Sequence, residues 1–417
     1  MASIPSRNPL KHLKAADLRG VAQLATQATS GVTRIAEGVH QSVWRTLGLP
    51  GGKQVGQAGG ITGLVYQGVQ GVTRMVGKGM SGLLFRLEPL LASAIPGEAA
   101  TPQREAVLAA LNGVIGDRLV ASANPLATPM SLRYQGSALD WGALPLLPPA
   151  CGKIVLLIHG LCMNDLQWQP TGATPAGDHA ATLAANLGYT PIYVRYNTGL
   201  HTSDNGHQLA ALLEQLLSHW PTPIVEITVL AHSMGGLVTR SAVHVARQSG
   251  LRWPAVLKNI VFLGTPHHGA PLERAGNWVD VILGSTPYSA PFAKLGQLRS
   301  AGITDLRFGH VQDADWQGHD RFKRLTDRRQ LLPLPEGVAC FTVAATTAAK
   351  RGLLADRLLG DGLVPLRSAL GQHDEAPRNL VFAKPSQWIA YRMNHMQLLT
   401  SPAVTQQLLQ WLTPKSY

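Results

Sequence analysis

Ser233 has the sequence context of a catalytic serine. It lies in the segment AHSMGG, between an apolar, β-branched run that ends at His232 and a helical pattern that starts directly after the serine. A strand-to-helix turn of this kind strains the serine and exposes its hydroxyl, and it needs small neighbours that do not meet the adjacent strand and helix. Gly235 meets this need, and Ala231 adds only a methyl where the usual pattern has glycine. We therefore predict that Ser233 is a nucleophile.

A serine hydroxyl is a weak nucleophile at neutral pH, so it needs a base that is itself held by a carboxylate. In folds with this turn, the acid and then the histidine follow the serine in the chain. Asp361 follows an expected strand and opens the turn GLVP, and His395 comes 34 residues later, before a last helical pattern. We predict that His395 is the general base and then the acid, and that Asp361 orients it. Asp356 is a rival acid, but its helix-like surroundings favour a solvated charge.

Acyl transfer also needs backbone donors for the negative charge that develops on the carbonyl oxygen. The apolar run KIVLLI ends in His159 and Gly160, and we expect the amide of the next residue, Leu161, to point into the site. The amide of Met234, directly after the serine, is the second expected donor. Gly160 permits a close approach of the chain. Four histidines are expected to line the site as structural groups: His159, His232, His267 and His268.

The elements that position these residues begin at Lys153. Five apolar, β-branched runs, KIVLLIHG, TPIYVRY, IVEITVLAHS, KNIVFLGTP and VACFTVAAT, alternate with helical patterns such as HQLAALLEQLLSHW. This alternation predicts an α/β fold in which helices cover both faces of a mostly parallel sheet. The run NLVFAK, between Asp361 and His395, is a further expected strand. In an open sheet of this kind, functional residues lie at the carboxyl ends of the strands.

The chain has 417 residues, enough for two to three domains. We expect a Gly-rich amphipathic helical region over 1–95, a helical and Pro-rich connector over 96–150, and a catalytic domain over 151–417. In the first region, apolar residues recur at steps of three and four from Val21 and again from Ile61, and GVTR occurs twice, 40 residues apart. This pattern predicts two copies of one amphipathic helical unit.

Two interpretations of this N-terminal region stay open. Its helices form a hairpin that docks on the rest of the protein, or residues 1–90 make peripheral contact with a lipid or granule surface, with their arginines and lysines near the polar phase. Helical periodicity is commoner in docked helices, which favours the first interpretation. Sedimentation of residues 1–90 with liposomes or granules separates the two.

Composition narrows the function classes. Hydrophobic residues make up 45% of the chain, so wholesale disorder is excluded, and the formal net charge is +12. No basic run with interleaved aromatic residues is present, so we expect no nucleic-acid partner. Three scattered cysteines predict neither a disulfide framework nor a metal site, and no secretory signal or spanning helix is evident. We expect a cytoplasmic protein that needs no cofactor. Peripheral contact with a membrane or a granule is the open alternative.

Four motifs in order resemble one known family. They are IHGL at 158–161, AHSMGG at 231–236, LGTPHHG at 263–269 and GDGLVP at 360–365, followed by His395. From about Gly152 to Leu412 the chain resembles the α/β-hydrolase superfamily, and within it the lipase and GPI inositol-deacylase-like branch. The resemblance implies an α/β-hydrolase fold, and it carries the triad and oxyanion roles onto the residues named above. It also implies a lid-like insertion over about 270–335.

The leading hypothesis is a serine carboxylic-ester hydrolase of the lipase or esterase type, which cleaves acyl esters or lipids through an acyl-enzyme intermediate. An intracellular polyester depolymerase or a thioesterase would use the same triad on a different acyl donor. A hypothesis from another class is a binding protein with a hydrolase fold whose N-terminal helices coat lipid or a storage granule. A complete predicted triad argues against this last reading, because a scaffold has no need of all three groups.

Overall fold

The computed structural model describes residues 19–20, 102–142, 144, 151–169, 175–270, 299–321, 326–349 and 360–414. Apart from Arg19 and Gly20, the expected helical region over 1–95 lies outside the described residues. So do Asp356 and, within the expected lid, residues 271–298 and 322–325. The Gly20 carbonyl accepts a hydrogen bond from Asn124 Nδ2 at 3.1 Å.

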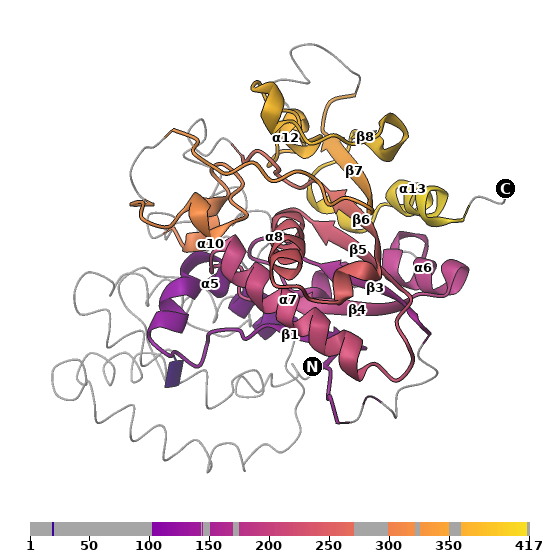
Figure 1. The fold of residues 1–417 in the computed structure, drawn as a ribbon, viewed down its shortest axis with the longest axis horizontal. Helices are drawn as coiled ribbons and strands as arrows, with labels where there is room; N and C mark the ends of the chain where they lie inside the picture. The colour runs from indigo at the N-terminus through magenta and orange to yellow at the C-terminus, as the bar shows by residue number, and fades with distance from the viewer. Residues whose placement is uncertain are drawn as a thin grey trace, which may run out of the picture.

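The described residues form a sheet of eight strands in the order β2-β1-β4-β3-β5-β6-β7-β8 (Figure 1). Strands β3 to β8 are parallel, and β1 pairs antiparallel with both β4 and β2. The strands are β1 (Ser131–Tyr134), β2 (Ser137–Ala138), β3 (Lys153–Ile158), β4 (Thr190–Arg195), β5 (Glu226–His232), β6 (Leu257–Leu263), β7 (Ala339–Thr346) and β8 (Gln387–Tyr391). The five parallel strands that the sequence predicts are present.

Register aligns the carboxyl ends of the central strands. Ile158 of β3 pairs with Val194 of β4 on one side and with Ala231 of β5 on the other. His232, the last residue of β5, pairs with Leu263, the last residue of β6. The loops that leave β3, β4, β5 and β6 therefore start at one edge of the sheet.

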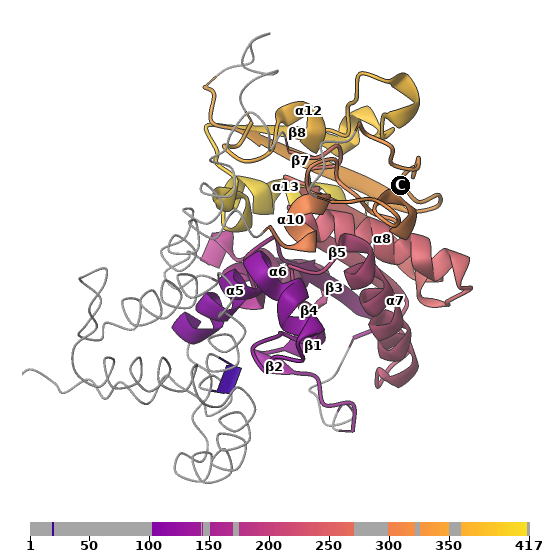
Figure 2. The same ribbon diagram turned by 90° about the vertical axis from the view of Figure 1, so that its left-hand side faces the viewer.

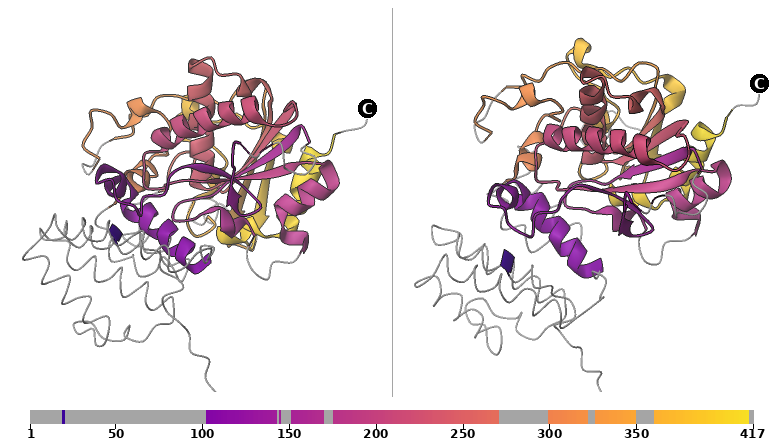
Figure 3. Two further views of the ribbon diagram at one scale, coloured as in Figure 1. Left: turned by 90° about the horizontal axis from the view of Figure 1, so that it is seen from below. Right: turned by 60° about the horizontal axis from the view of Figure 1, so that its bottom comes forward.

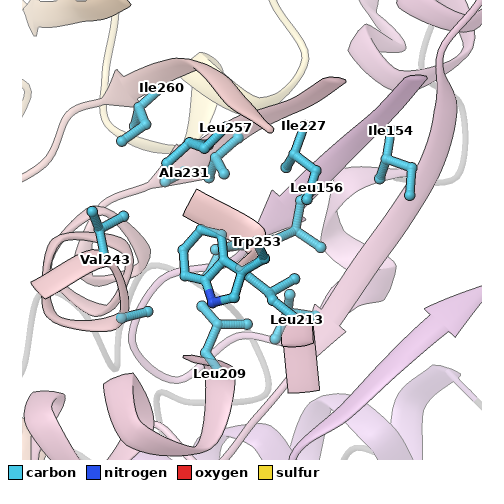
Figure 4. Close-up of a cluster of buried hydrophobic side chains, with 14 of the residues drawn as sticks. Ile154, Leu156, Leu209, Leu213, Ile227, Ala231, Val243, Trp253, Leu257 and Ile260 are labelled. Atoms are coloured by element: carbon cyan, nitrogen blue, oxygen red, sulfur yellow. The ribbon is translucent and has the colours of Figure 1, made fainter. Parts of the chain in front are cut away.

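Alternate residues of β3 enter two separate cores, as the two-residue period of a strand requires. Ile154, Leu156 and Ile158 pack with residues of α7 (Thr202–His219) and α8 (Met234–Gln248). Val155 and Leu157 pack with residues of α6 (His179–Leu187) and α13 (Pro402–Leu412). Helices thus cover both faces of the sheet, as Figures 1 and 2 show. Figure 4 shows Trp253 and Leu156 in the first of these cores.

The helix α5 (Pro102–Ala121) lies along one side of this layered body (Figure 3). It bends at Ile115, whose φ of −135° and ψ of 19° are not helical. Its apolar residues share a third buried cluster with Leu161 and Met234. The helix that the sequence assigns to the connector therefore packs on residues expected in the site.

The remaining described elements are short. They are α10 (Ala301–Asp305), α12 (Leu366–Ala369), η4 (Asp165–Trp168), η5 (Pro175–Gly177), η6 (Trp253–Ala255), η8 (Asp313–Asp315), η9 (Ala376–Arg378), η10 (Lys384–Ser386) and η11 (Met396–Leu399). No helix among the described residues combines the length and the apolar character needed to span a bilayer.

Two features differ from the expectation. The sheet starts before residue 151, because the short segment SLRY pairs with β4 as β1, and four half-polar residues carry too little signal to be recognised. The run NLVFAK is not a strand, and β8 lies further on at Gln387–Tyr391. Leu380 and Phe382 satisfy its alternating pattern by packing in the α7 and α8 core, while Val381 between them is 88% exposed.

Leu156→Ala tests the central core. The Leu156 side chain is fully buried, so its truncation leaves a cavity and is expected to lower the free energy of unfolding by about 2–5 kcal/mol. Val225→Ala is the control, because Val225 is 60% exposed and its truncation should cost less than about 0.5 kcal/mol. Urea unfolding of both variants makes the comparison, and equal costs would contradict the assignment of β3 to the core.

Candidate active site

Ser233 has the strained geometry that its sequence context predicts. Its φ of 55° and ψ of −124° lie in a region that residues other than glycine rarely adopt. Its amide donates to the Leu263 carbonyl at 2.8 Å, and its carbonyl accepts from the Gly236 amide at 3.0 Å. A Cβ on Gly235 would lie 2.6 Å from the Ile158 carbonyl oxygen, so this turn requires glycine there. The serine is thus presented between β5 and α8 at the carboxyl edge of the sheet.

Asp361 and His395 form a buried hydrogen-bonded pair. The His395 Nδ1 atom lies 2.6 Å from Asp361 Oδ2. The other carboxylate oxygen, Oδ1, accepts from the amides of Leu363 at 3.0 Å and Val364 at 2.8 Å, and the His395 amide donates to the Asp361 carbonyl. Since the carboxylate accepts, Nδ1 carries the proton and Nε2 of His395 is left as an acceptor. The pair therefore has the arrangement of a base and its orienting acid.

His232 links the serine turn to the histidine loop. Its Nε2 donates to the His395 carbonyl at 3.1 Å, and the two imidazole rings lie 4.5 Å apart. Gly264, which follows β6, lies next to the Asp361–His395 pair: a Cβ there would lie 3.1 Å from both Asp361 Oδ2 and His395 Cε1. Three loops thus bring Ser233, Asp361 and His395 to one place. No hydrogen bond joins the Ser233 hydroxyl to His395, and in substrate-free enzymes such bonds often tighten only in the complex.

The two predicted backbone donors flank the serine. Met234 is the first residue of α8, where an amide has no partner within the helix. Leu161 follows Gly160, at which a Cβ would lie 2.9 Å from Ser233 Cβ. Neither amide donates to another described residue, and both side chains are buried. The two amides predicted as donors thus lie next to the serine turn, without a hydrogen-bond acceptor among the described residues.

The sheet order and the strained serine turn between β5 and α8 together decide the fold. The chain has the α/β-hydrolase fold.

Residues 140–305 match a family model described as a domain of unknown function, DUF7379. A comparison with curated proteins gives no match. Among solved structures, the mature form of a Bacillus licheniformis lipase is 18% identical over 64% of this chain and 93% of its own, with a TM-score of 0.41. EstA from Clostridium botulinum is 12% identical over 72% of this chain and 97% of its own, also with a TM-score of 0.41.

Lipase B from Aspergillus fumigatus is 11% identical over 93% of this chain and 83% of its own, with a TM-score of 0.35. None of these three proteins is described as a GPI inositol deacylase. Assignment to that branch therefore stays a prediction.

Two of the expected site-lining histidines lie elsewhere. The His267 ring is fully buried against Phe262 and Phe382, at centroid distances of 4.7 and 5.6 Å. His268 Nε2 lies 3.0 Å from the Gly371 carbonyl. Neither ring has a contact with Ser233, Asp361 or His395 in the part of the chain that the structure describes. The LGTPHHG motif serves the packing behind β6, whereas His159 and His232 do adjoin the serine turn.

Three residues at the end of β4 were not predicted from the sequence. Arg195, Tyr196 and Thr198 each bind the loop that carries Gly160 and Leu161. Polar residues directly after a parallel strand were the available signal, because the carboxyl ends of such strands surround the site. The run VRYNTG lacks a known motif and was therefore passed over.

Burial keeps several histidines near the sheet neutral. Desolvation lowers the pKa of His159 to about 4, and that of His268 also to about 4. The pKa values of His232 and His267 are lowered well below the ordinary value, again chiefly by desolvation. His179, whose two ring nitrogens bond Thr405 and the Leu398 carbonyl, has a lowered pKa for the same reason. At neutral pH these five imidazole rings are therefore uncharged.

Acid should therefore destabilise the fold. Between about pH 6.5 and pH 4 the unfolded chain binds protons on these histidines that the folded chain does not, so stability is full above pH 6.5 and falls as pH decreases. His159→Phe keeps an aromatic ring against Tyr196 but removes one such site. The loss of unfolding free energy between pH 7.5 and pH 5 should then become smaller by about 2 kcal/mol. Urea unfolding at pH 7.5 and 5 measures it, and equal wild-type stability at both would contradict the prediction.

Proposed function

We propose that the protein is a serine carboxylic-ester hydrolase of the lipase or esterase type. The observation that carries the proposal is the buried Asp361–His395 pair, which lies beside the strained Ser233 turn at the carboxyl edge of the sheet. Each member of the pair is fixed by further hydrogen bonds, as preorganised catalysis requires. Ser233 is the proposed nucleophile, His395 the base and then the acid, and Asp361 the orienting carboxylate.

The proposed reaction has two halves. Ser233 Oγ attacks the ester carbonyl while His395 Nε2 takes the hydroxyl proton, and the amides of Leu161 and Met234 stabilise the oxyanion. Collapse of this intermediate breaks the ester bond, and His395 returns the proton to the leaving alcohol. Water then attacks the acyl-enzyme with the same base, which releases the acid and restores Ser233. Asp361 stays ionised and stabilises the imidazolium in both halves. No cofactor is needed for these steps.

The surroundings of the two amides favour an acyl substrate. The side chains of Leu161 and Met234 belong to an apolar cluster with residues of α5 and with Ile303 and Leu306. An apolar wall next to an oxyanion site suits a hydrocarbon chain better than a charged group. We therefore propose acyl esters or lipids as the substrate class. Binding of residues 1–90 to a lipid or granule surface, and a cytoplasmic location, remain separate hypotheses.

Hydrolysis of p-nitrophenyl esters from acetate to palmitate, with and without emulsified lipid, tests this function. Wild type should hydrolyse the series, and Ser233→Ala should lower kcat by at least about 10⁴-fold, because the acyl-enzyme can no longer form. Activity that grows with chain length or with an interface would support a lipase. Equal activity of wild type and Ser233→Ala would overturn the proposal. Activity on acyl thioesters or polyester alone would assign the same triad to the alternative acyl donors.

The acid is tested by Asp361→Asn. The amide side chain cannot hold the imidazole in the required tautomer, so kcat should decrease by about 10⁴-fold while the protein stays folded. Asp374→Asn is the matched control, because Asp374 lies 13 residues further on with a side chain 86% exposed. Its kcat should remain within about twofold of wild type. Similar losses in both variants would argue against Asp361 as the orienting group.

A further inference from the structure

The loop that leaves β3 is tied to the chain that leaves β4 at three points. Tyr196 Oη donates to the His159 carbonyl at 2.7 Å, Thr198 Oγ1 accepts from the Cys162 amide at 3.1 Å, and the Arg195 guanidinium pairs with the Asp165 carboxylate. These contacts lie before, directly after and beyond Leu161. The backbone that carries the first proposed oxyanion donor is therefore held from the neighbouring strand.

The Thr198 contact acts on a strained peptide. Cys162 has a φ of 59°, in the left-handed region that favours glycine. A cysteine keeps this conformation only where its surroundings impose it. The Cys162 amide belongs to the peptide group directly after Leu161, and its hydrogen bond to Thr198 is buried. Loss of the bond would leave that buried amide without a partner, so the peptide group between Leu161 and Cys162 could rotate and change the orientation of the adjoining Leu161 N–H.

Helix α5 covers the other side of the same turn. A Cβ on Gly113 would lie 2.3 Å from Cys162 Sγ, so the helix and the loop are in close contact. Burial raises the pKa of the Cys162 thiol to about 12, so the thiol is a neutral packing group and not a second nucleophile. The turn is thus confined between α5 and Thr198.

Thr198 itself lies on a rigid support. Asn197 Nδ2 donates to the Gly116 carbonyl of α5 at 3.0 Å, and its Oδ1 accepts from the Gly199 amide at 3.0 Å. Asn205 of α7 donates to the Asn197 carbonyl, also at 3.0 Å. Thr198 is 1% exposed. Its hydroxyl is therefore held at a fixed position with respect to both α5 and α7.

We propose that Thr198 is a positioning residue for catalysis: its hydroxyl fixes the Cys162 amide and thereby aims the Leu161 N–H at the developing oxyanion. The inference rests on the proposed function and adds a residue to it. The oxyanion forms only in the transition state, so a misdirected donor lowers kcat and leaves ground-state binding nearly unchanged. Thr198 does not touch the substrate; it acts through the loop.

The test compares Thr198→Val, which keeps the shape but removes the acceptor, with Thr198→Ser, which keeps the hydroxyl. Thr198→Val should lower kcat for the best p-nitrophenyl ester by about 10-fold to 100-fold with KM within about twofold, and should slow labelling by a p-nitrophenyl alkylphosphonate similarly. Thr198→Ser should retain most of the activity. Thr202→Val is the matched control, because the Thr202 hydroxyl is buried four residues further on without a hydrogen-bond partner among the described residues.

Unchanged kcat in Thr198→Val, or an equal loss in Thr198→Ser or Thr202→Val, would overturn the positioning role. Thermal unfolding checks that each variant is folded. If Thr198→Val does not fold, Thr198→Cys replaces it, because a thiol fills the space but accepts hydrogen bonds weakly, and it must show the same loss of kcat. A wild type that hydrolyses no ester and takes no phosphonate label would overturn the proposed function, and this inference with it. If wild type is active, the proposed function stands, and the Thr198 variants alone decide the positioning role.

Discussion

The backbone turn at Ser233 is the constraint on which the rest of the structure depends. Ser233 adopts a positive φ, which is strained for a residue with a side chain. The conformation is held by the hydrogen bond from the Ser233 amide to the Leu263 carbonyl and by the close approach of Gly235 to the Ile158 carbonyl. Both contacts reach into neighbouring strands. The turn therefore holds its geometry only while β3, β5 and β6 keep their mutual register, and the large apolar cores on both faces of the sheet maintain that register.

Burial keeps the histidines next to this turn uncharged. His159 and His232 lie next to the serine turn, and desolvation keeps both imidazole rings neutral. His232 contributes through a hydrogen bond to the His395 carbonyl and not through its charge. A neutral, apolar environment strengthens the two amide dipoles that face a developing negative charge. The same burial makes the fold sensitive to acid.

The sequence indicated the parts of the site whose chemistry is local. Ser233 and Gly160 closely follow apolar strands, and Asp361 opens a turn further along the chain after β7. Parallel strands bring their carboxyl ends together, so recognition of the strands and of this turn was enough to group the three residues. The role of Thr198 depends on one long-range bond to Cys162, for which no local pattern exists. β1 was not predicted because a segment of four residues, half of them polar, carries a weak signal. Leu380 and Phe382 showed the alternating pattern of a strand because alternate burial does not require pairing with another strand. His267 adjoins a motif in sequence, yet its ring faces the core behind β6.

The position of α5 has a consequence for biosynthesis. This helix is made before every strand of the sheet, and one of its partners is made much later: the Gly113 carbonyl accepts from the Ser300 hydroxyl, 187 residues further along the chain. At roughly 5–20 residues per second, that separation corresponds to about 10–40 s on the ribosome. Throughout this interval the part of its apolar face that packs with Ile303 and Leu306 lacks these native partners. Nascent chains stalled before residue 300 would thus expose this face to chaperones, and the rate of translation becomes a determinant of how much protein reaches the native state.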